Sequence, residues 1–329
     1  MRQVFLTGSR QLEIREVPIP EPGPGDLVIR VEVALTCGTD LKTYRRGQHP
    51  RIPVPGPFGH EYTGRVARVG PGVQGFREGD AVMGVNTGPC FSCPYCQRGR
   101  FQHCETLFDD VVLGTYADYV RIPARVVRTN LFLRPPEIPE VVAPLVEPLA
   151  SALHGIQILR PWHEEILVIG SGPLGILLAY VLQQEGNRVT LVGRNATRNQ
   201  VAREIGIQRV LPSVPENEVF DAVVEATGVP EVWQQSLSYL RKGGRVLLFG
   251  GLPASTRVSF LAYALHYEEK HLLGAFHFTP QEVKQAYEFL REHGTRLQPL
   301  ITDTLPLSRI TEAFERLDRG EGLKYAIVP

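Results

Sequence analysis

The sequence predicts an α/β protein with a mostly β first domain and a second domain built on a doubly wound parallel sheet. From Val4 to about Val127, short apolar runs alternate with glycine- and proline-rich turns, which is typical of β-strands. From Glu165 onward, strand-like apolar runs alternate with helical segments, which is typical of a parallel sheet covered on both faces. The length of 329 residues also suits two domains better than one core.

In the first domain, the expected strands follow one another at short intervals. The apolar runs that predict them cover residues 27–35, 62–70, 80–85 and 117–122. The proline-rich segments 20–26 and 50–59 between them are expected to be loops. Near Pro135 the pattern changes, and a helix is expected over 145–159.

In the second domain, strands and helices are expected to alternate. Strands are predicted at 165–170, 188–193, 220–228, 245–251 and 271–276, and helices at 171–186, 197–206 and 231–244. An amphipathic helix is expected at 281–294, then a strand and a helix within 301–322 and a closing strand at 324–329. The place of these last elements beyond the sheet is compatible with a return to the first domain.

The composition of the chain argues against two classes of partner, nucleic acids and membranes. The 35 Lys and Arg residues balance the 35 Asp and Glu residues, which argues against a nucleic-acid partner. No apolar stretch reaches membrane length, and the N-terminal residues lack the apolar core of a signal peptide. We therefore expect a cytoplasmic protein with no membrane partner.

Four of the five cysteines stand close together, at Cys90, Cys93, Cys96 and Cys104. Two-residue spacers let a tight loop fold its thiolates around one tetrahedral zinc ion, and Cys104 supplies the fourth ligand. A disulfide cluster of a secreted protein is the alternative, but cysteine is sparse elsewhere. A nucleic-acid-binding zinc ribbon would require a basic patch, which the balanced charge does not suggest. The spacing predicts a closed, structural zinc site.

A glycine-rich turn predicts a dinucleotide site. Gly170, Gly172 and Gly175 form G-x-G-x-x-G between a predicted strand and a helix that begins near Pro173, with Leu174 inside the motif. The first glycine makes the turn, the second lets the backbone approach a pyrophosphate, and the third lets the helix pack on the strand. An ordinary tight turn is the alternative, but a strand, turn, helix and second strand in this order favour dinucleotide binding.

The end of the next strand favours NADP over NAD. An NAD site usually carries Asp or Glu about 20 residues after the glycine motif. Here Gly193 is followed by Arg194, Asn195 and Arg198, which leaves room and positive charge for a 2′-phosphate. The alternative is that both arginines are solvated surface residues.

Further cofactor contacts are expected from the loops after later strands. Ligands of parallel sheets bind at the carboxyl ends of the strands. We therefore expect contacts with a nicotinamide from Thr227, Gly250 and Gly251. The alternative for these glycines is tight turning between elements.

A second metal site of open character is suggested by Cys37 with the adjacent pair His60 and Glu61. None of these residues is diagnostic alone, because a single buried cysteine is usually a small hydrophobe.

Several motifs together resemble the zinc-dependent medium-chain dehydrogenase/reductase family of alcohol, sorbitol and threonine dehydrogenases. The matching pieces are CGTD at 37–40, GHE at 59–61, the cysteine lobe at 90–104, VEPL at 146–149 and GSGPLG at 170–175. The resemblance covers essentially the whole chain. It implies a GroES-like catalytic domain over 1–145, with a zinc lobe at about 88–106, a Rossmann domain over 146–275, and a return to the catalytic domain over 276–329.

The resemblance also implies two zinc ions per chain, one structural and one catalytic. The catalytic ion would be held by Cys37, His60 and a carboxylate from Glu61 or Glu147, bound directly or through water. One thiolate, one neutral imidazole and one carboxylate neutralise the ion and leave a position open for substrate. Glutamate at 147 looks more like the polyol dehydrogenases than the alcohol dehydrogenases.

Thr39 and Lys42 stand at two positions of the family's proton relay; Thr39 matches the relay and Lys42 departs from it. Thr39 matches the hydroxyl that accepts the proton of the substrate alcohol. Lys42 stands where many relatives carry a histidine, and we expect it to contact the nicotinamide ribose. A proton relay and a surface position are the alternatives for Lys42.

The implied reaction is hydride transfer between NADP, or NAD, and a secondary alcohol, polyol, or sugar or cyclitol hydroxyl. Oxidation of an amino alcohol, as in the threonine dehydrogenases, is an alternative. Reduction of an activated double bond, as in zinc-free quinone reductase relatives, is disfavoured by Cys37 and the cysteine lobe. A non-catalytic dinucleotide sensor is the alternative of another class. The expected partners are a small alcohol or ketone and further copies of the chain, as a dimer or tetramer.

Overall fold

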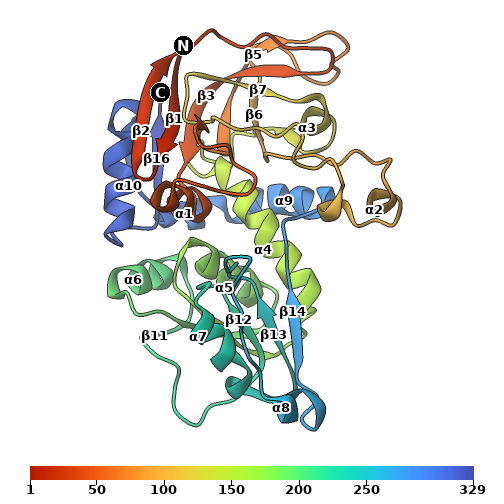
Figure 1. The fold of residues 1–329 in the computed structure, drawn as a ribbon, viewed down its shortest axis with the longest axis vertical. Coiled ribbons are helices and arrows are strands. Elements are labelled where there is room, and N and C mark those ends of the chain that lie inside the picture. Colours follow the sequence, from red (N-terminus) through yellow and green to blue (C-terminus); the bar gives the residue numbers. More distant parts are fainter. The chain divides into compact units, whose positions relative to one another are not determined.

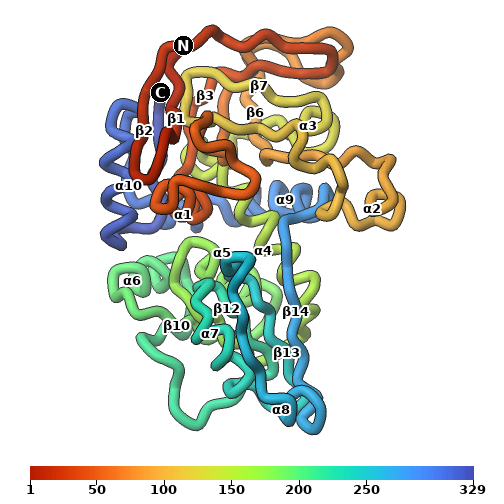
Figure 2. Tube along the Cα trace, viewed as in Figure 1, coloured from red at the N-terminus to blue at the C-terminus, as the bar shows by residue number.

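The computed structural model describes all 329 residues and divides the chain into two compact units. The first unit contains Met1–Glu147 and Thr279–Pro329, and the second contains Pro148–Phe278. The chain leaves the first unit through α4 (Val146–Leu159) and re-enters it before α9 (Pro280–Leu297), as the trace shows (Figure 2).

The first unit is built on a seven-stranded sheet in which six strands follow one another in the order β15-β16-β3-β5-β6-β8, and β7 also pairs with β3 (Figure 1). A smaller sheet has the order β2-β1-β4. The bounds of the larger sheet are β15 (Ile301–Pro306), β16 (Lys324–Val328), β3 (Leu27–Leu35), β5 (Glu61–Val69), β6 (Ala81–Gly84), β8 (Leu131–Leu133) and β7 (Tyr119–Ile122). Those of the smaller one are β1 (Arg2–Gly8), β2 (Gln11–Glu16) and β4 (Gly56–Pro57).

The C-terminal strand takes an interior position in this sheet. β16 runs parallel to β15 and antiparallel to β3, where Ala326 pairs with Leu35. On its other side β3 pairs antiparallel with β5, and Leu35 faces Glu61. The end of β3, the start of β5 and the start of β16 therefore meet at one place in the sheet.

Aromatic packing fixes the helices of the first unit against this region. α10 (Ile310–Asp318) buries Ile310, Ala313, Phe314 and Leu317, which recur at the spacing of one helix face. The ring of Phe314 lies 5.4 Å from that of Phe58, which directly precedes the segment that carries His60.

α1 (Gly38–Arg46) begins directly after Cys37 and ends at Gly47, whose φ of 65° is left-handed. The remaining short helices are α2 (Pro94–Gln97) and α3 (Ala124–Thr129).

The second unit is a six-stranded, all-parallel sheet in the order β11-β10-β9-β12-β13-β14. Numbered from β9, this is the order 3-2-1-4-5-6 of dinucleotide-binding sheets. The strands are β9 (Glu165–Ile169), β10 (Arg188–Val192), β11 (Arg209–Leu211), β12 (Phe220–Glu225), β13 (Leu240–Leu248) and β14 (His271–Gly274). The helices are α5 (Pro173–Gln184), α6 (Ala196–Ile205), α7 (Pro230–Gln235) and α8 (Ala262–His266), together with most of α4.

The predicted α/β class is confirmed, but one predicted helix is wrong in extent. The segment 231–244 was expected to be helical throughout, whereas α7 ends at Gln235 and β13 begins at Leu240. The cause is a set of contacts with residues outside the segment. The Arg241 guanidinium donates hydrogen bonds to Asp221 and Glu165, at the starts of β12 and β9, and these bonds hold the start of β13 in the sheet. The helix α1 was not predicted, because its sequence lacks a clear apolar period.

No helix combines the length and the apolar character needed to cross a lipid bilayer.

Candidate metal and dinucleotide sites

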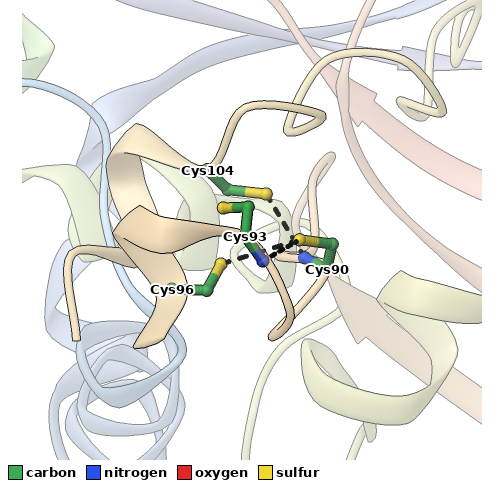
Figure 3. Close-up of side chains that lie close together, drawn as sticks. All are labelled: Cys90, Cys93, Cys96 and Cys104. Carbon is green, nitrogen blue, oxygen red and sulfur yellow. Dashed lines mark hydrogen bonds between the residues drawn. The ribbon is translucent and has the colours of Figure 1, made fainter. Parts of the chain in front are cut away.

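The four clustered cysteines converge in one lobe of the first unit (Figure 3). Their sulfur atoms all lie within 4.8 Å of one another, and no disulfide joins them. Sγ of Cys90 lies 3.9 Å from Sγ of Cys96. Four thiolates around a tetrahedral zinc ion, with bonds of about 2.3 Å, would be separated by roughly 3.8 Å. The spacing of the sulfur atoms therefore fits a four-thiolate zinc site.

Hydrogen bonds to sulfur favour the thiolate form of Cys90, whereas burial raises the pKa of Cys96 to about 12. The backbone amides of Ser92 and Cys93 donate to Sγ of Cys90 at 3.4 and 3.3 Å, and the amide of Cys90 donates to Sγ of Cys104 at 3.3 Å. The hydroxyl of Ser92 and the backbone amides of Ser92 and Cys93 lower the pKa of Cys90 to about 5. A thiolate at neutral pH is the form that binds zinc.

The second group of metal-ligating side chains is formed by Cys37, His60 and Glu61. One ligand atom from each lies within 4.8 Å of the other two. Cys37 follows β3 and caps α1, where its sulfur accepts a hydrogen bond from the amide of Thr39 at 3.4 Å. His60 and Glu61 stand at the start of the neighbouring strand β5. The pairing of β3 with β5 thus brings together residues that are far apart in the sequence.

Asp40 orients His60. Oδ1 of Asp40 lies 3.0 Å from Nδ1 of His60, and its other oxygen accepts a hydrogen bond from the Tyr116 hydroxyl at 2.7 Å. With Nδ1 facing a carboxylate, Nε2 is the ring atom that would be left to bind a metal ion. Burial alone would lower the pKa of His60, but attraction to Asp40 and Cys37 raises it well above its ordinary value. The surroundings of the imidazole are therefore strongly attractive to positive charge.

Lys324 neutralises Glu61. Its Nζ donates to both carboxylate oxygens of Glu61, at 2.8 and 2.6 Å, and to the carbonyl oxygen of Thr36 at 2.7 Å. Burial alone would lower the pKa of Lys324, but attraction to Glu61 and Cys37 outweighs it and raises this pKa. Lys324 therefore carries its charge inside the protein.

Glu147 is a buried carboxylate without a partner. It lies in the first turn of α4, is 8% exposed, and makes no hydrogen bond or ion pair. Burial raises its pKa to about 7, with smaller effects from His60 and Glu61. A buried carboxylate normally has a hydrogen-bonding or cationic partner. The thiol of Cys37, the imidazole of His60 and the carboxylate of Glu61 are donor types that zinc accepts, and Glu147 lies near enough for its pKa to respond to His60 and Glu61.

The proposed relay residues lie on α1. Thr39 is half-buried, and its carbonyl oxygen accepts a hydrogen bond from the Thr43 hydroxyl at 2.8 Å. Lys42 is exposed.

The glycine-rich turn of the second unit has the geometry that the motif predicts. Gly170 has a φ of 118°, and a Cβ on Gly175 would lie 1.8 Å from the carbonyl oxygen of Gly170. At Gly172, by contrast, a Cβ would meet nothing within 4 Å, so the space above it is open. Pro173 begins α5, and Leu174 follows inside the helix. The open side and the free amides of the helix start suit a pyrophosphate.

The end of β10 carries a free positive charge. Arg194 is exposed and makes no hydrogen bond or ion pair. The side chain of Asn195 caps α6 by accepting a hydrogen bond from the amide of Arg198 at 3.0 Å. Gly193 is buried, and its amide donates to the carbonyl oxygen of Leu211 at 3.0 Å. No carboxylate follows this strand before α6.

The loops after β12 and β13 are held by Glu225. Its carboxylate accepts hydrogen bonds from the amides of Thr227, at 2.7 Å, and Gly228, at 3.1 Å, while Trp233 donates to the carbonyl oxygen of Gly250 at 3.0 Å. Gly251 is exposed next to Gly250. Because β9, β10, β12 and β13 are parallel, these loops and the glycine-rich turn share the carboxyl edge of the sheet.

Asp40, Lys324 and Glu225 were not identified from the sequence. Asp40 belongs to the CGTD segment, where an acid three residues after Cys37, a candidate ligand, was the available signal. Lys324 had one weak signal, a rare lysine in an otherwise apolar strand. Glu225 likewise ends an apolar strand, directly before a Thr-Gly turn.

Comparison with known proteins finds two family matches. Residues 23–130 match the family described as alcohol dehydrogenase GroES-like domain, and residues 142–327 match that described as glucose dehydrogenase C-terminus. The L-threonine 3-dehydrogenase of Deinococcus deserti is 31% identical over 329 aligned residues, covering 95% of this chain and 94% of that protein.

Two solved structures resemble this chain along its whole length. The alcohol dehydrogenase TADH of Thermus sp. ATN1 is 26% identical with a TM-score of 0.88, covering 100% of this chain and 99% of that one. A Sinorhizobium meliloti 1021 protein, described as a zinc-binding dehydrogenase and solved bound to NADP, is 27% identical with a TM-score of 0.89 and the same coverage.

Proposed function

The chain belongs to the zinc-dependent medium-chain dehydrogenase/reductase family, and from this premise we propose that it transfers a hydride between a secondary alcohol or polyol and NADP. Sugar and cyclitol hydroxyls belong to the same proposed substrate class, and NAD is the less favoured cofactor. The chain is an oxidoreductase that acts on CH–OH groups. The observation that carries the proposal is the group formed by Cys37, His60 and Glu61, in which one ligand atom from each residue lies within 4.8 Å of the other two. The buried Glu147, whose pKa responds to His60 and Glu61, adds a further carboxylate to the surroundings of this group.

For the catalytic metal, we propose Cys37, His60 and Glu147 as the ligands. Glu61 is supported as a candidate by its distance, but Lys324 already neutralises its charge through two hydrogen bonds. A thiolate and the Glu147 carboxylate together balance a divalent cation, and three protein ligands leave one position open. A second zinc ion would be held by the four thiolates of the lobe.

For the reaction, we propose that Thr39 accepts the proton of the substrate hydroxyl and that Lys42 contacts the nicotinamide ribose. When bound, zinc lowers the pKa of a hydroxyl and the nicotinamide accepts the hydride. Asp40 keeps Nε2 of His60 turned toward the metal position. The hydrogen bonds of Glu225 keep the Thr227–Gly228 turn in place at the sheet edge.

The preference for NADP is supported by Arg194 and Gly193. A guanidinium without a partner is available to pair with a 2′-phosphate, and no carboxylate follows β10 to repel it. Glycine at 193 also leaves room for the phosphate group.

The test is a steady-state assay of polyols, secondary alcohols and sugars with NADP and with NAD. We expect turnover of at least one secondary alcohol, with a higher kcat/KM for NADP than for NAD. Turnover with zinc removed from the Cys37 site would contradict the proposed chemistry, and a higher kcat/KM for NAD would contradict the cofactor preference.

Oxidation of an amino alcohol is the second candidate function. It is favoured by the similarity to L-threonine 3-dehydrogenases along 95% of the chain. L-threonine belongs in the same assay, and a kcat/KM for L-threonine above that of every polyol would favour this candidate.

Metal analysis distinguishes the proposed enzyme from a non-catalytic dinucleotide sensor. Two zinc ions per chain favour the enzyme, whereas zinc in the cysteine lobe alone favours the sensor.

We also propose a cytoplasmic homo-oligomer, a dimer or tetramer. The sheet of the second unit ends at β14, whose outer edge is unpaired. In the segment that precedes β14, Leu261, Tyr263 and Tyr267 are 70%, 57% and 69% exposed. The free state of all five cysteines suits a reducing compartment. Light scattering of the purified protein measures the number of copies, and a monomer would contradict this proposal.

A further inference from the structure

We propose that Tyr116 is a positioning residue of the metal site, because its hydroxyl fixes Asp40 and Asp40 in turn fixes the ring of His60. Tyr116 lies three residues before β7 and its side chain is fully buried. The inference rests on the proposed metal site of Cys37 and His60, and it adds a residue that acts on this site without touching the metal.

The Tyr116 hydroxyl has two possible acceptors but only one proton. Oδ2 of Asp40 lies 2.7 Å from the hydroxyl oxygen, and the carbonyl oxygen of Leu35 lies 3.1 Å from it. A hydrogen bond to a carboxylate is stronger than one to a neutral carbonyl group, so the proton goes to Asp40. Burial and the charge of Asp40 raise the pKa of Tyr116 well above its ordinary value, and the hydroxyl therefore remains a donor.

Asp40 depends on this bond for its orientation. The carboxylate is fully buried, with the Tyr116 hydroxyl at one oxygen and Nδ1 of His60, at 3.0 Å, at the other. The last torsion of an aspartate side chain is soft, so the carboxylate turns easily unless a partner holds it. Without the hydroxyl, only the histidine would hold the carboxylate, and the orientation of both groups would be less fixed.

The ring of Tyr116 also lies against the segment that leads into His60. A Cβ on Gly59 would be 2.7 Å from Cδ2 and 2.9 Å from Cε2 of Tyr116, so the ring lies directly on the backbone before His60. The amide of Tyr116 donates to the carbonyl oxygen of Phe58 at 3.2 Å. One buried residue therefore holds the backbone next to His60 with its ring and amide, and Asp40 with its hydroxyl.

Tyr62 provides the matched control. It is also fully buried in the same apolar core, but its hydroxyl donates to the carbonyl oxygen of Val85, at 3.2 Å, and not to a side chain beside the metal site. Tyr116→Phe and Tyr62→Phe each remove one buried hydroxyl and keep the ring. A purely structural loss should therefore lower the Tm of the zinc-depleted protein to a similar extent in both variants.

The measured quantity is the Kd for Zn²⁺, determined by competition with a chromophoric chelator. Cys37→Ser identifies which dissociation step belongs to the Cys37 site. We expect Y116F to weaken zinc binding at this site by roughly tenfold or more, the usual effect of removing an outer partner of a metal ligand. Y62F should stay within about twofold of the wild type. The zinc of the cysteine lobe should be unchanged in both variants.

Asp40→Ala tests whether Tyr116 acts through Asp40. In D40A the hydroxyl has no carboxylate to hold, so adding Y116F should change the Kd for zinc by less than about twofold. Three outcomes would overturn the inference but leave the metal site standing: a Y116F protein that binds zinc as tightly as the wild type, equal weakening by Y116F and Y62F, or the full additional loss from Y116F in D40A. A wild type that holds zinc only in the cysteine lobe would overturn the proposed metal site as well.

Discussion

Lys324 and Glu61 form a buried ion pair in which one ammonium group donates to both oxygens of one carboxylate, at 2.8 and 2.6 Å. The two residues are separated by 263 positions in the sequence, and both side chains are almost fully buried. The first prediction concerns the stability that depends on this pair.

Lys324→Met should lower the free energy of unfolding by about 3 to 5 kcal/mol, because it leaves the Glu61 carboxylate buried and unpaired. Urea denaturation of the zinc-depleted protein measures the change. The matched control is the double variant K324M/E61M, which removes both charges and should recover most of the loss. A double variant as unstable as K324M alone would show that the ion pair is not the cause.

Glu147→Gln should remove the zinc of the Cys37 site, because it takes away the carboxylate that has no other partner. Glu61→Gln, the matched control, should keep that zinc, since the charge of Glu61 is already balanced by Lys324. Elemental analysis after dialysis should find one zinc ion per chain for E147Q and two for E61Q. The reverse pattern would make Glu61 the ligand.

Cys37→Ser should reduce kcat by roughly a thousandfold or more, because metal polarisation of the hydroxyl contributes several kcal/mol to such reactions. Its Kd for NADPH, measured by fluorescence, should stay within about twofold of the wild type. Cys96→Ser addresses the other site, and its main effect should be a lower Tm, because a zinc lobe depends on its metal for folding. A C37S protein with full turnover would contradict the assignment.

Arg194→Gln should weaken binding of NADPH by roughly ten- to a hundredfold, the loss expected for a hydrogen bond between charged groups. Binding of NADH should change little, since NADH has no 2′-phosphate. Arg128, an exposed arginine of α3 in the first unit, provides the charge-matched control as R128Q. Equal losses for the two cofactors would count against Arg194 as a phosphate ligand.

Asp118→Asn should lower the free energy of unfolding by about 0.5 to 1 kcal/mol at pH 7, the usual value of a partly exposed ion pair. Burial alone would raise the pKa of Asp118, but the bonds donated by Arg2, at 2.7 Å from the guanidinium and 2.5 Å from the amide, hold it below the usual value.

A lowered carboxyl pKa stabilises the folded state above the unfolded pKa, and this stabilisation disappears as the pH falls through the folded pKa. The difference between D118N and the wild type should therefore shrink below about pH 4, where the unfolded carboxyl begins to take up its proton. A difference that stays constant down to pH 2 would contradict this role of the charge.

The features that could be predicted from the sequence are local ones. The cysteine lobe and the glycine-rich turn each form within a short segment, so the spacing of Cys90, Cys93 and Cys96, or of Gly170 and Gly172, carries the geometry. Most strands of both units were recognisable for the same reason, because an apolar run is a property of neighbouring residues. The strands β1, β2, β4, β8 and β11 were not predicted.

The features that were missed depend on partners that are distant in the sequence. Nothing in the segment around Lys324 indicates that β16 lies beside β3, where its ammonium group meets Glu61. The helix expected over 231–244 failed in the same way, since Arg241 takes its partners from the starts of two other strands.

β16 lies between β15 and β3, so its position also determines when the larger sheet can be completed during synthesis of the chain. The ribosome makes Cys37, His60 and Glu61 long before it makes Lys324, so the nascent first unit exposes the edge of β3 and an unneutralised Glu61 while the second unit is being translated. The larger sheet is completed only after residues 324–328 have emerged. Pairing over such long loops is slow, and the surroundings of the candidate metal site are therefore completed as one of the last steps of folding.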